Sequence, residues 1–166
     1  MTDDREPIKI WVPGDPPEGP TLLSWIDERL AIGSYCQAAH RELMISEGIE
    51  TVVSIGNLQP SYSADSGIHH DVFPLVEDCT DTFSSVEIRC VVTAIIEGSE
   101  RGKTFVHCAA GVSRSPGFTT AALCHRDGLR WEEALEIVES GRPQTKVHRL
   151  IEKRLRSWLE DSNFDH

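Results

Sequence analysis

The chain has 166 residues, of which 39% are hydrophobic and 26% are charged, and its formal net charge is −11. This length and composition predict a single globular domain with a substantial core, and no apolar run is long enough to span a membrane. Because an acidic protein binds anionic surfaces poorly, we expect neither nucleic acid nor a membrane as partner.

The expected domain runs from residue 24 to residue 162. The extension before it, 1–23, is rich in Pro and Gly, and residues 12–20 are interpreted as a loop. Residues 163–166 form a short tail. The acidic first residues are unlike the basic start of a signal peptide, so we expect a cytoplasmic protein.

The first half of the domain predicts strands around one helix. Apolar segments at 24–26 and 29–32 predict strands that break at Gly33-Ser34, and 37–47 predicts a helix that ends at Gly48. The β-branched run 51–55 and the segment 69–76 predict two further strands. We interpret His69-His70 as a pair on opposite faces of a strand, because no third metal ligand has suitable spacing.

The second half is mainly helical. Apolar spacing predicts helices over 82–100, 131–140 and 146–159. A further helix is expected over 115–127, stopped by Gly128, and a short buried strand over 104–107. Strands and helices in this order predict an α/β fold: a central mixed, largely parallel sheet of about five strands flanked by helices.

One segment carries the chemistry. Residues 107–115 read His-Cys-Ala-Ala-Gly-Val-Ser-Arg-Ser, with Cys108 and Arg114 six positions apart and Gly111 halfway. Arg114 can clamp two phosphate oxygens with its planar fork. The backbone N–H groups of the intervening residues can surround the same phosphate, and these are the predicted substrate-binding residues Ala109, Ala110, Gly111, Val112 and Ser113.

A strand, a tight loop and a helix present an anion to the helix N-terminus. The same positive field favours the thiolate of Cys108, which is a competent nucleophile. The segment also lies in the less acidic part of the chain, since residues 1–100 carry 18 acidic and 5 basic side chains while 101–166 carry 9 and 11. The sequence therefore predicts a phosphate site built around Cys108.

This segment resembles the H-C-x-x-G-x-x-R-S signature of cysteine-dependent protein tyrosine phosphatases. Its ending, Gly-Val-Ser-Arg-Ser-Pro, is especially similar to the dual-specificity branch. The resemblance covers about residues 24 to 160 and includes the opening segment 28–34, the segment 73–78 and the Gly-Arg-Pro at 141–143. It implies a phosphatase-like fold and catalytic domain.

The resemblance also implies roles for individual residues. Cys108 attacks phosphorus to form a phosphocysteine, Asp78 protonates the leaving oxygen, and Arg114 binds the equatorial oxygens. Ser115 hydrogen-bonds Cys108, and His107 supports the loop. No metal or cofactor is implied, because Arg114 and the backbone N–H groups supply the charge stabilisation.

Two assignments have alternatives. Asp81 is the second candidate for the general acid, although it can instead cap the helix that starts near Phe83. His148 stands where the family often has an asparagine that braces the phosphate loop. It either takes over this supporting role or is an exposed histidine at the start of a helix.

The predicted reaction is metal-independent hydrolysis of phosphotyrosine, phosphoserine and phosphothreonine in a protein or peptide partner. The interior of the loop has no Lys or Arg, whereas lipid phosphatases of the superfamily that it resembles tend to have basic residues there, so the resemblance implies a single phosphate and not a multiply phosphorylated lipid. The alternatives are a non-protein substrate, such as an RNA 5′ end, a glycan or a small phosphoester, and a phosphate-binding module without turnover.

The five cysteines are scattered, which indicates neither a disulfide framework nor a zinc site. They are Cys36, Cys79, Cys90, Cys108 and Cys124. Inert burial is the simplest interpretation for those other than Cys108. The alternative is a reversible disulfide of Cys108 with Cys79 or Cys124 that protects it from over-oxidation.

Overall fold

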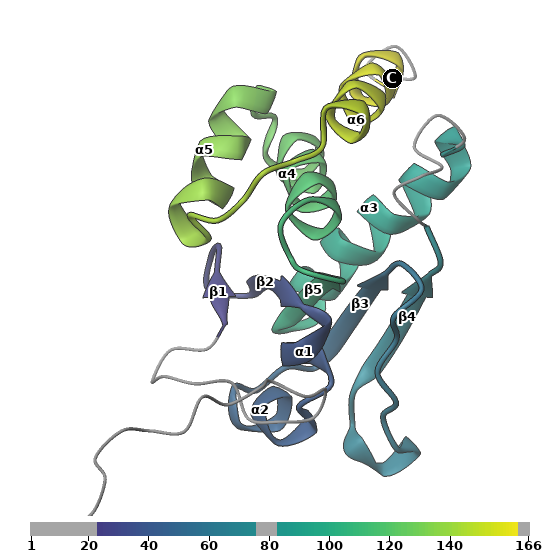
Figure 1. Ribbon diagram of the computed structural model, residues 1–166, viewed down its shortest axis with the longest axis vertical. Helices are drawn as coiled ribbons and strands as arrows, with labels where there is room; N and C mark the ends of the chain where they lie inside the picture. Colours follow the sequence, from purple (N-terminus) through teal and green to yellow (C-terminus); the bar gives the residue numbers. More distant parts are fainter. Residues whose placement is uncertain (1–22, 76–82, 163–166) are drawn as a thin grey trace, which may run out of the picture.

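The computed structural model describes residues 23–75 and 83–162. A five-stranded sheet with strand order β1-β2-β5-β3-β4 forms its centre (Figure 1). Strand β1 pairs antiparallel with β2, and the other neighbouring strands are parallel. The predicted mixed, largely parallel sheet is confirmed. The strands are β1 Ser24–Trp25, β2 Leu30–Ser34, β3 Thr51–Ile55, β4 His69–Phe73 and β5 Thr104–Cys108.

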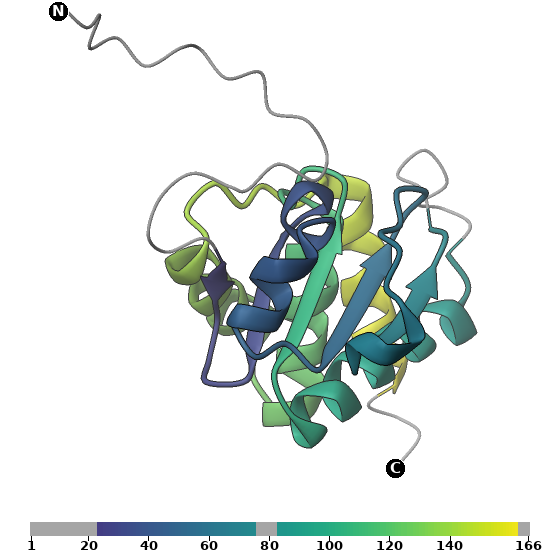
Figure 2. The same ribbon diagram turned by 90° about the horizontal axis from the view of Figure 1, so that it is seen from below.

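Helices of the described residues cover both faces of the sheet, the longer ones on one face and the short ones on the other (Figures 1 and 2). A single 3₁₀ turn, Ala64–Ser66, precedes β4. The two short helices are α1 Tyr35–Ala38 and α2 Arg41–Ser46, and the four longer ones are α3 Ser85–Arg101, α4 Arg114–Asp127, α5 Trp131–Gly141 and α6 Arg149–Ser162.

Alternating side chains of the strands explain this layered arrangement. In β2, Leu30 and Ile32 join the core beneath α3 to α6, whereas Ala31 joins Ala38 and Met44 on the side of α1 and α2. Because successive strand residues point to opposite faces, a strand that is buried on both faces is mostly apolar along its whole length. The β-branched run at 51–55 comes close to this pattern, and all five of its residues are buried.

The predicted break at Gly33-Ser34 is wrong, since β2 continues through Ser34 and pairs with β5 up to Cys108. Gly33 is needed here for space: a Cβ on Gly33 would lie 2.8 Å from the ring of Phe105. This glycine therefore permits close packing and does not end the strand. Gly33 stands opposite His107 and Ser34 opposite Cys108, so β2 ends beside the predicted phosphate site.

The predicted helix over 37–47 is two short helices. His40 separates them with a non-helical backbone, and its ring Nδ1 accepts a hydrogen bond from the N–H of Leu43 at 3.0 Å. The imidazole of His40 caps the N-terminus of α2, a role usually taken by Ser, Asp or Asn. The periodicity of the apolar residues continues across the break, so it could not reveal the cap.

Other element ends differ by a few residues from the prediction. Strand β4 ends at Phe73, and α6 begins and ends three residues later than expected. Helix α3 begins at Ser85, with Ser84 accepting from Glu87 N–H and Glu87 accepting from Ser84 N–H. Ser84 is therefore the cap of α3, a role that the sequence had left open for Asp81.

Candidate active site

The Cys108–Arg114 loop connects the end of β5 to the start of α4, at the edge where all the parallel strands have their carboxyl ends (Figure 1). This edge is where ligands bind in α/β sheets. Gly111 has φ +71, and a Cβ there would lie 2.5 Å from the backbone of Gly33. Only glycine fits this turn, so the pattern of the signature has a steric cause.

The loop is held from outside by its carbonyl groups. The Ala109 carbonyl accepts from Tyr35 N–H at 3.0 Å, and the Val112 carbonyl accepts from Lys146 N–H at 2.8 Å. Within the described ranges, the N–H groups of residues 109–113 donate to no acceptor. With the carbonyls bound on the outer side, these N–H groups remain as donors for an anion.

Arg142 is a supporting residue that the sequence analysis missed. Its side chain is only 6% exposed, and it donates from Nε to the Gly111 carbonyl at 2.5 Å and from Nη2 to the Ala110 carbonyl at 3.3 Å. Its Nη1 reaches Ser24 Oγ at 3.0 Å, and burial lowers the pKa of the guanidinium. The Gly-Arg-Pro motif at 141–143 was the available signal.

Cys108 and Ser115 face each other at the base of the loop. Cys108 is 3% exposed, and its Sγ lies 3.3 Å from Ser115 Oγ. Ser115 Oγ also donates to the Gly33 carbonyl at 3.3 Å. A hydroxyl has one proton and can rotate, so Ser115 can serve either the carbonyl or a sulfur anion. This pair can therefore stabilise a thiolate that forms and disappears during a reaction.

The guanidinium of Arg114 has one N–H group that a substrate oxyanion could bind. Its Nη1 donates to the Leu75 carbonyl at 2.9 Å, and its buried Nε has no partner among the described residues. A buried N–H without an acceptor is costly, and a phosphate oxygen would satisfy it. Leu75 directly precedes the segment 76–82, so Asp78, Asp81 and Cys79 all lie outside the described residues.

His107 is buried beneath the loop. Its Nδ1 lies 3.0 Å from the carbonyl oxygen of Cys108, and its Nε2 lies 2.6 Å from Ser54 Oγ. Burial is the main cause that lowers the pKa of this imidazole from 6.5 to about 4. His107 is therefore neutral at physiological pH, and it contacts the backbone of the site rather than the space above the loop.

His148 contacts the loop through its main chain. The backbone N–H of His148 donates to Ser113 Oγ at 2.9 Å, while its exposed imidazole accepts from Leu150 N–H at the start of α6. The prediction that the His148 imidazole takes over the role of the family's asparagine is therefore wrong: the imidazole binds Leu150 N–H and not the loop. The brace is a backbone donor, which almost any residue type at this position could supply.

A disulfide between Cys108 and Cys124 does not fit the fold. Cys124 lies in α4, ten residues after Arg114, so the rise of the helix separates it from the loop by roughly 15 Å. A disulfide needs Cα atoms within about 7 Å of each other. Cys124 is 8% exposed, and burial is the main cause that raises the pKa of its thiol to about 11, which is typical of an inert cysteine.

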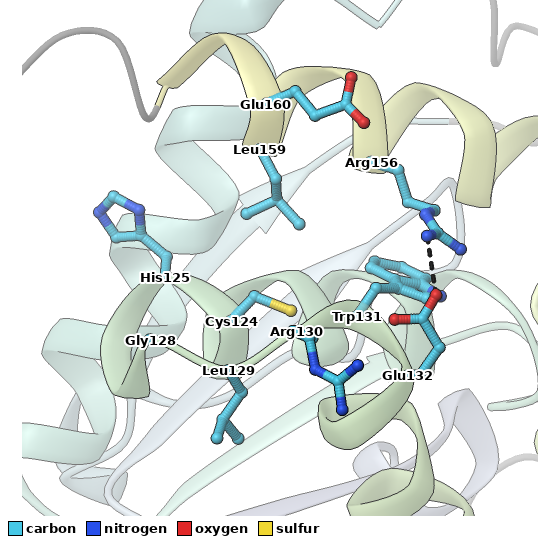
Figure 3. Close-up of a pocket in the computed structure, with 10 residues that line it drawn as sticks. All are labelled: Cys124, His125, Gly128, Leu129, Arg130, Trp131, Glu132, Arg156, Leu159 and Glu160. Carbon is cyan, nitrogen blue, oxygen red and sulfur yellow. Dashed lines mark hydrogen bonds and ion pairs between the residues drawn. The ribbon is translucent and has the colours of Figure 1, made fainter.

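The remaining candidate features lie away from the loop. The exposed His69 pairs with Asp71, and no group of three metal-ligating side chains occurs within 23–75 and 83–162. A pocket of about 570 Å³ lies between α4, α5 and α6, where Cys124, Trp131 and Leu159 contribute to its wall (Figure 3). No helix in the described part of the chain has the length and hydrophobicity to cross a membrane.

A largely parallel sheet that leads into a cysteine–arginine loop at a helix N-terminus is the arrangement expected of a cysteine-dependent phosphatase domain. The chain belongs to the dual-specificity phosphatase family, because the family described as "Dual specificity phosphatase, catalytic domain" matches residues 30–160. The resemblance predicted from the loop is thus confirmed.

Two of the curated relatives that the chain matches are named as dual-specificity phosphatases. The chain is 30% identical over 132 residues to human "Dual specificity protein phosphatase 12", covering 76% of this chain and 38% of that protein. It is 30% identical over 131 residues to "Dual specificity protein phosphatase 1B" of Arabidopsis thaliana, covering 76% and 75%. The chain spans less than half the length of several relatives, the human one included.

Solved structures show the same fold. A crystal structure of human DUSP28 superposes with a TM-score of 0.75 at 23% identity, covering 85% of this chain and 98% of that chain. Structural similarity at this level of identity concerns the fold, and the chemistry must be argued from the site itself.

Proposed function

We propose that this protein hydrolyses phosphomonoesters through a phosphocysteine intermediate on Cys108, without a metal. The observation that carries the proposal is the loop itself: Cys108 Sγ, the N–H groups of 109–113 without acceptors, and the unpartnered Nε of Arg114 among the described residues. Together they offer a nucleophile and a set of donors for one tetrahedral anion. Residues 24–162 form the proposed catalytic unit.

In the first step, the Cys108 thiolate attacks phosphorus, the S–P bond forms and the P–O ester bond breaks. Asp78 gives its proton to the leaving oxygen. In the second step, Asp78 removes a proton from water, which attacks the phosphocysteine and releases inorganic phosphate. Ser115 then donates to the departing sulfur, which leaves as a thiolate.

The chain length between Leu75 and Asp78 allows Asp78 to act at the site. Leu75 is held by Arg114 at 2.9 Å, and Asp78 follows three residues later. Three residues of extended chain reach roughly 10 Å, so the Asp78 carboxyl has enough chain length to reach a leaving oxygen beside Arg114.

The proposed substrates are phosphotyrosine, phosphoserine and phosphothreonine in proteins or peptides. The loop interior offers only neutral side chains, from Ala109 to Ser113, which suits a single phosphate. The names of the relatives support a protein substrate. A cytoplasmic location stays a prediction. The expectation that the protein binds neither nucleic acid nor membranes also stays a prediction, based on its composition.

The test is hydrolysis of an aryl phosphate in the presence of a metal chelator. Wild type should turn over, Cys108→Ser should not, and Cys90→Ser, which alters an exposed cysteine on α3, should match wild type. Asp78→Asn should slow the reaction by roughly 10² to 10⁴-fold, whereas Asp81→Asn should change it little. Turnover that survives Cys108→Ser would exclude the phosphocysteine.

The substrate class needs a second measurement. Phosphopeptides, a 5′-phosphorylated RNA and a sugar phosphate are compared by kcat/KM with the same enzyme. The proposal expects phosphopeptides to be the best substrates. A preference for RNA or sugar phosphate would assign the site to a non-protein ester, and phosphate binding without turnover would assign it to a binding module.

A further inference from the structure

Three side chains connect the outer strand of the sheet to the backbone of Cys108. His70 Nε2 lies 2.7 Å from Ser54 Oγ, which lies 2.6 Å from His107 Nε2, and His107 Nδ1 lies 3.0 Å from the Cys108 carbonyl. They come from β4, β3 and β5, and Ser54 stands directly opposite His107 in the strand register. We name these three residues the histidine–serine chain.

The direction of every hydrogen bond in this chain follows from its last member. The Cys108 carbonyl can only accept, so His107 Nδ1 carries the proton. Because the buried His107 is neutral, its Nε2 has a lone pair and accepts from the Ser54 hydroxyl. Ser54 Oγ then accepts from the N–H of His70 Nε2. The opposite arrangement would place two acceptors 3.0 Å apart at Cys108.

The same direction holds in both charge states of His70. An imidazolium carries a proton on Nε2, and so does the neutral tautomer that the chain requires. The titratable and aromatic groups near His70 are the ring of Tyr62, edge-on at 5.0 Å between ring centroids, and the side chains of Asp71 and His69. His70 Nε2 is therefore a donor to Ser54 in both charge states, and the hydrogen bonds of the histidine–serine chain keep their direction when His70 gains or loses a proton.

The consequence for the site comes through the peptide plane. The Cys108 carbonyl and the Ala109 N–H belong to the same planar unit, so fixing one fixes the direction of the other. Ala109 N–H is one of the loop donors, and Cys108 bears the nucleophilic sulfur. We propose that Ser54 and His70 are positioning residues for Cys108, acting by holding the His107 ring, in its Nδ1–H tautomer, against the Cys108 carbonyl.

This inference rests on the proposed function of Cys108 but is measured separately from turnover. Nitrogen-15 chemical shifts of the imidazole rings, recorded by long-range proton–nitrogen NMR on the intact chain, distinguish the two tautomers. The pH midpoint and rate of alkylation of Cys108 by iodoacetamide report the state of its sulfur. Hydrolysis of an aryl phosphate gives kcat and KM.

The variants separate the members of the chain. Ser54→Ala removes the donor to His107, His70→Leu removes the donor to Ser54, and His70→Gln retains an N–H at a similar reach. His69→Leu is the matched control, because the exposed His69 pairs with Asp71 and not with the chain. The dispersion of the NMR spectrum shows whether each variant is folded.

Wild type, His70→Gln and His69→Leu should hold His107 as the Nδ1–H tautomer. Ser54→Ala removes one of the two hydrogen bonds that hold the His107 ring, so part of the population should turn away from the Cys108 carbonyl and adopt the other tautomer. The midpoint of alkylation should rise, and kcat/KM should fall by roughly fivefold, the effect of one hydrogen bond, with kcat affected more than KM. His70→Leu should shift both readouts in the same direction, by less.

An unchanged tautomer and an unchanged midpoint in Ser54→Ala and His70→Leu would overturn the proposal, and if Ser54→Ala does not fold, His70→Leu alone decides it. If wild type shows no turnover, the proposed function fails, while the tautomer measurement still tests the role of the histidine–serine chain.

Discussion

Gly56→Ala provides a sharp test of how Arg114 is positioned. Gly56 follows β3 with φ +124, a conformation that residues with a side chain rarely adopt. A Cβ at this position would overlap Arg114 Nη1 and lie 3.1 Å from Arg114 Cζ. Ordinary contacts need about 3.5 to 4 Å, so the guanidinium must move by roughly 1 Å.

Two costs follow from this movement. The strained backbone costs about 1–3 kcal/mol, and losing the charged hydrogen bond from Arg114 to the Leu75 carbonyl costs about 1.5–3 kcal/mol. A displacement of about 1 Å in a group that binds the reacting phosphate can also slow catalysis by roughly 10²-fold. Both stability and activity should therefore fall.

Gly67→Ala is the matched control. Gly67 also has a positive φ, of +76, but a Cβ there meets nothing within 4 Å. Gly67→Ala should lower the free energy of unfolding only by the cost of the strained backbone, and its activity should be normal. Urea denaturation, aryl phosphate hydrolysis and inhibition by inorganic phosphate are measured for both variants. If Gly56→Ala hydrolyses substrate and binds phosphate as well as Gly67→Ala does, the proposed contact with Arg114 is wrong.

Three further predictions concern buried groups. The pKa of His107 is about 4 in the folded state and 6.5 in the unfolded state, so the unfolded state binds a proton more readily. The free energy of unfolding should therefore fall by about 3 kcal/mol as the pH decreases from above 6.5 to about 4. His107→Asn should flatten this dependence in urea titrations at several pH values, and an unchanged slope would contradict it. Phe118→Ala should cost about 3–5 kcal/mol in thermal unfolding, whereas the exposed Val86→Ala should stay within about 0.5, and equal losses would contradict the packing. Arg142→Lys, whose single ammonium cannot replace three donors, should lower kcat/KM by roughly tenfold; wild-type kinetics would show that the brace is dispensable.

The sheet and its order of elements could be predicted because local patterns there agree with the tertiary structure. The run 51–55 is buried on both faces and lies within the sheet, between β5 and β4. Helices α3, α5 and α6 have apolar residues at helical spacing that match their buried faces, whereas α4 is buried all round from Ser115 to Cys124. Element ends were less accurate, since they depend on caps such as Ser84 and His40, whose role appears only when a neighbouring N–H is in place.

The candidate site divides in the same way. Cys108, Gly111 and Arg114 could be predicted because their chemistry requires those residue types at that spacing. The supports could not, since they come from distant segments: Arg142 binds carbonyl groups, and His148 donates only its backbone N–H. The Gly-Arg-Pro motif marks the segment of Arg142 but not the carbonyl groups that it binds, and the backbone contact of His148 has no residue pattern at all.

The three segments that hold the loop carbonyls have a consequence for biosynthesis. Tyr35 lies early in the chain, whereas Arg142 and Lys146 lie near its end. A nascent chain that has just passed residue 115 already contains the complete signature but lacks two of these anchors. We therefore expect a phosphate-competent loop only late in synthesis, so a fragment that ends before residue 142 should carry the motif without the site.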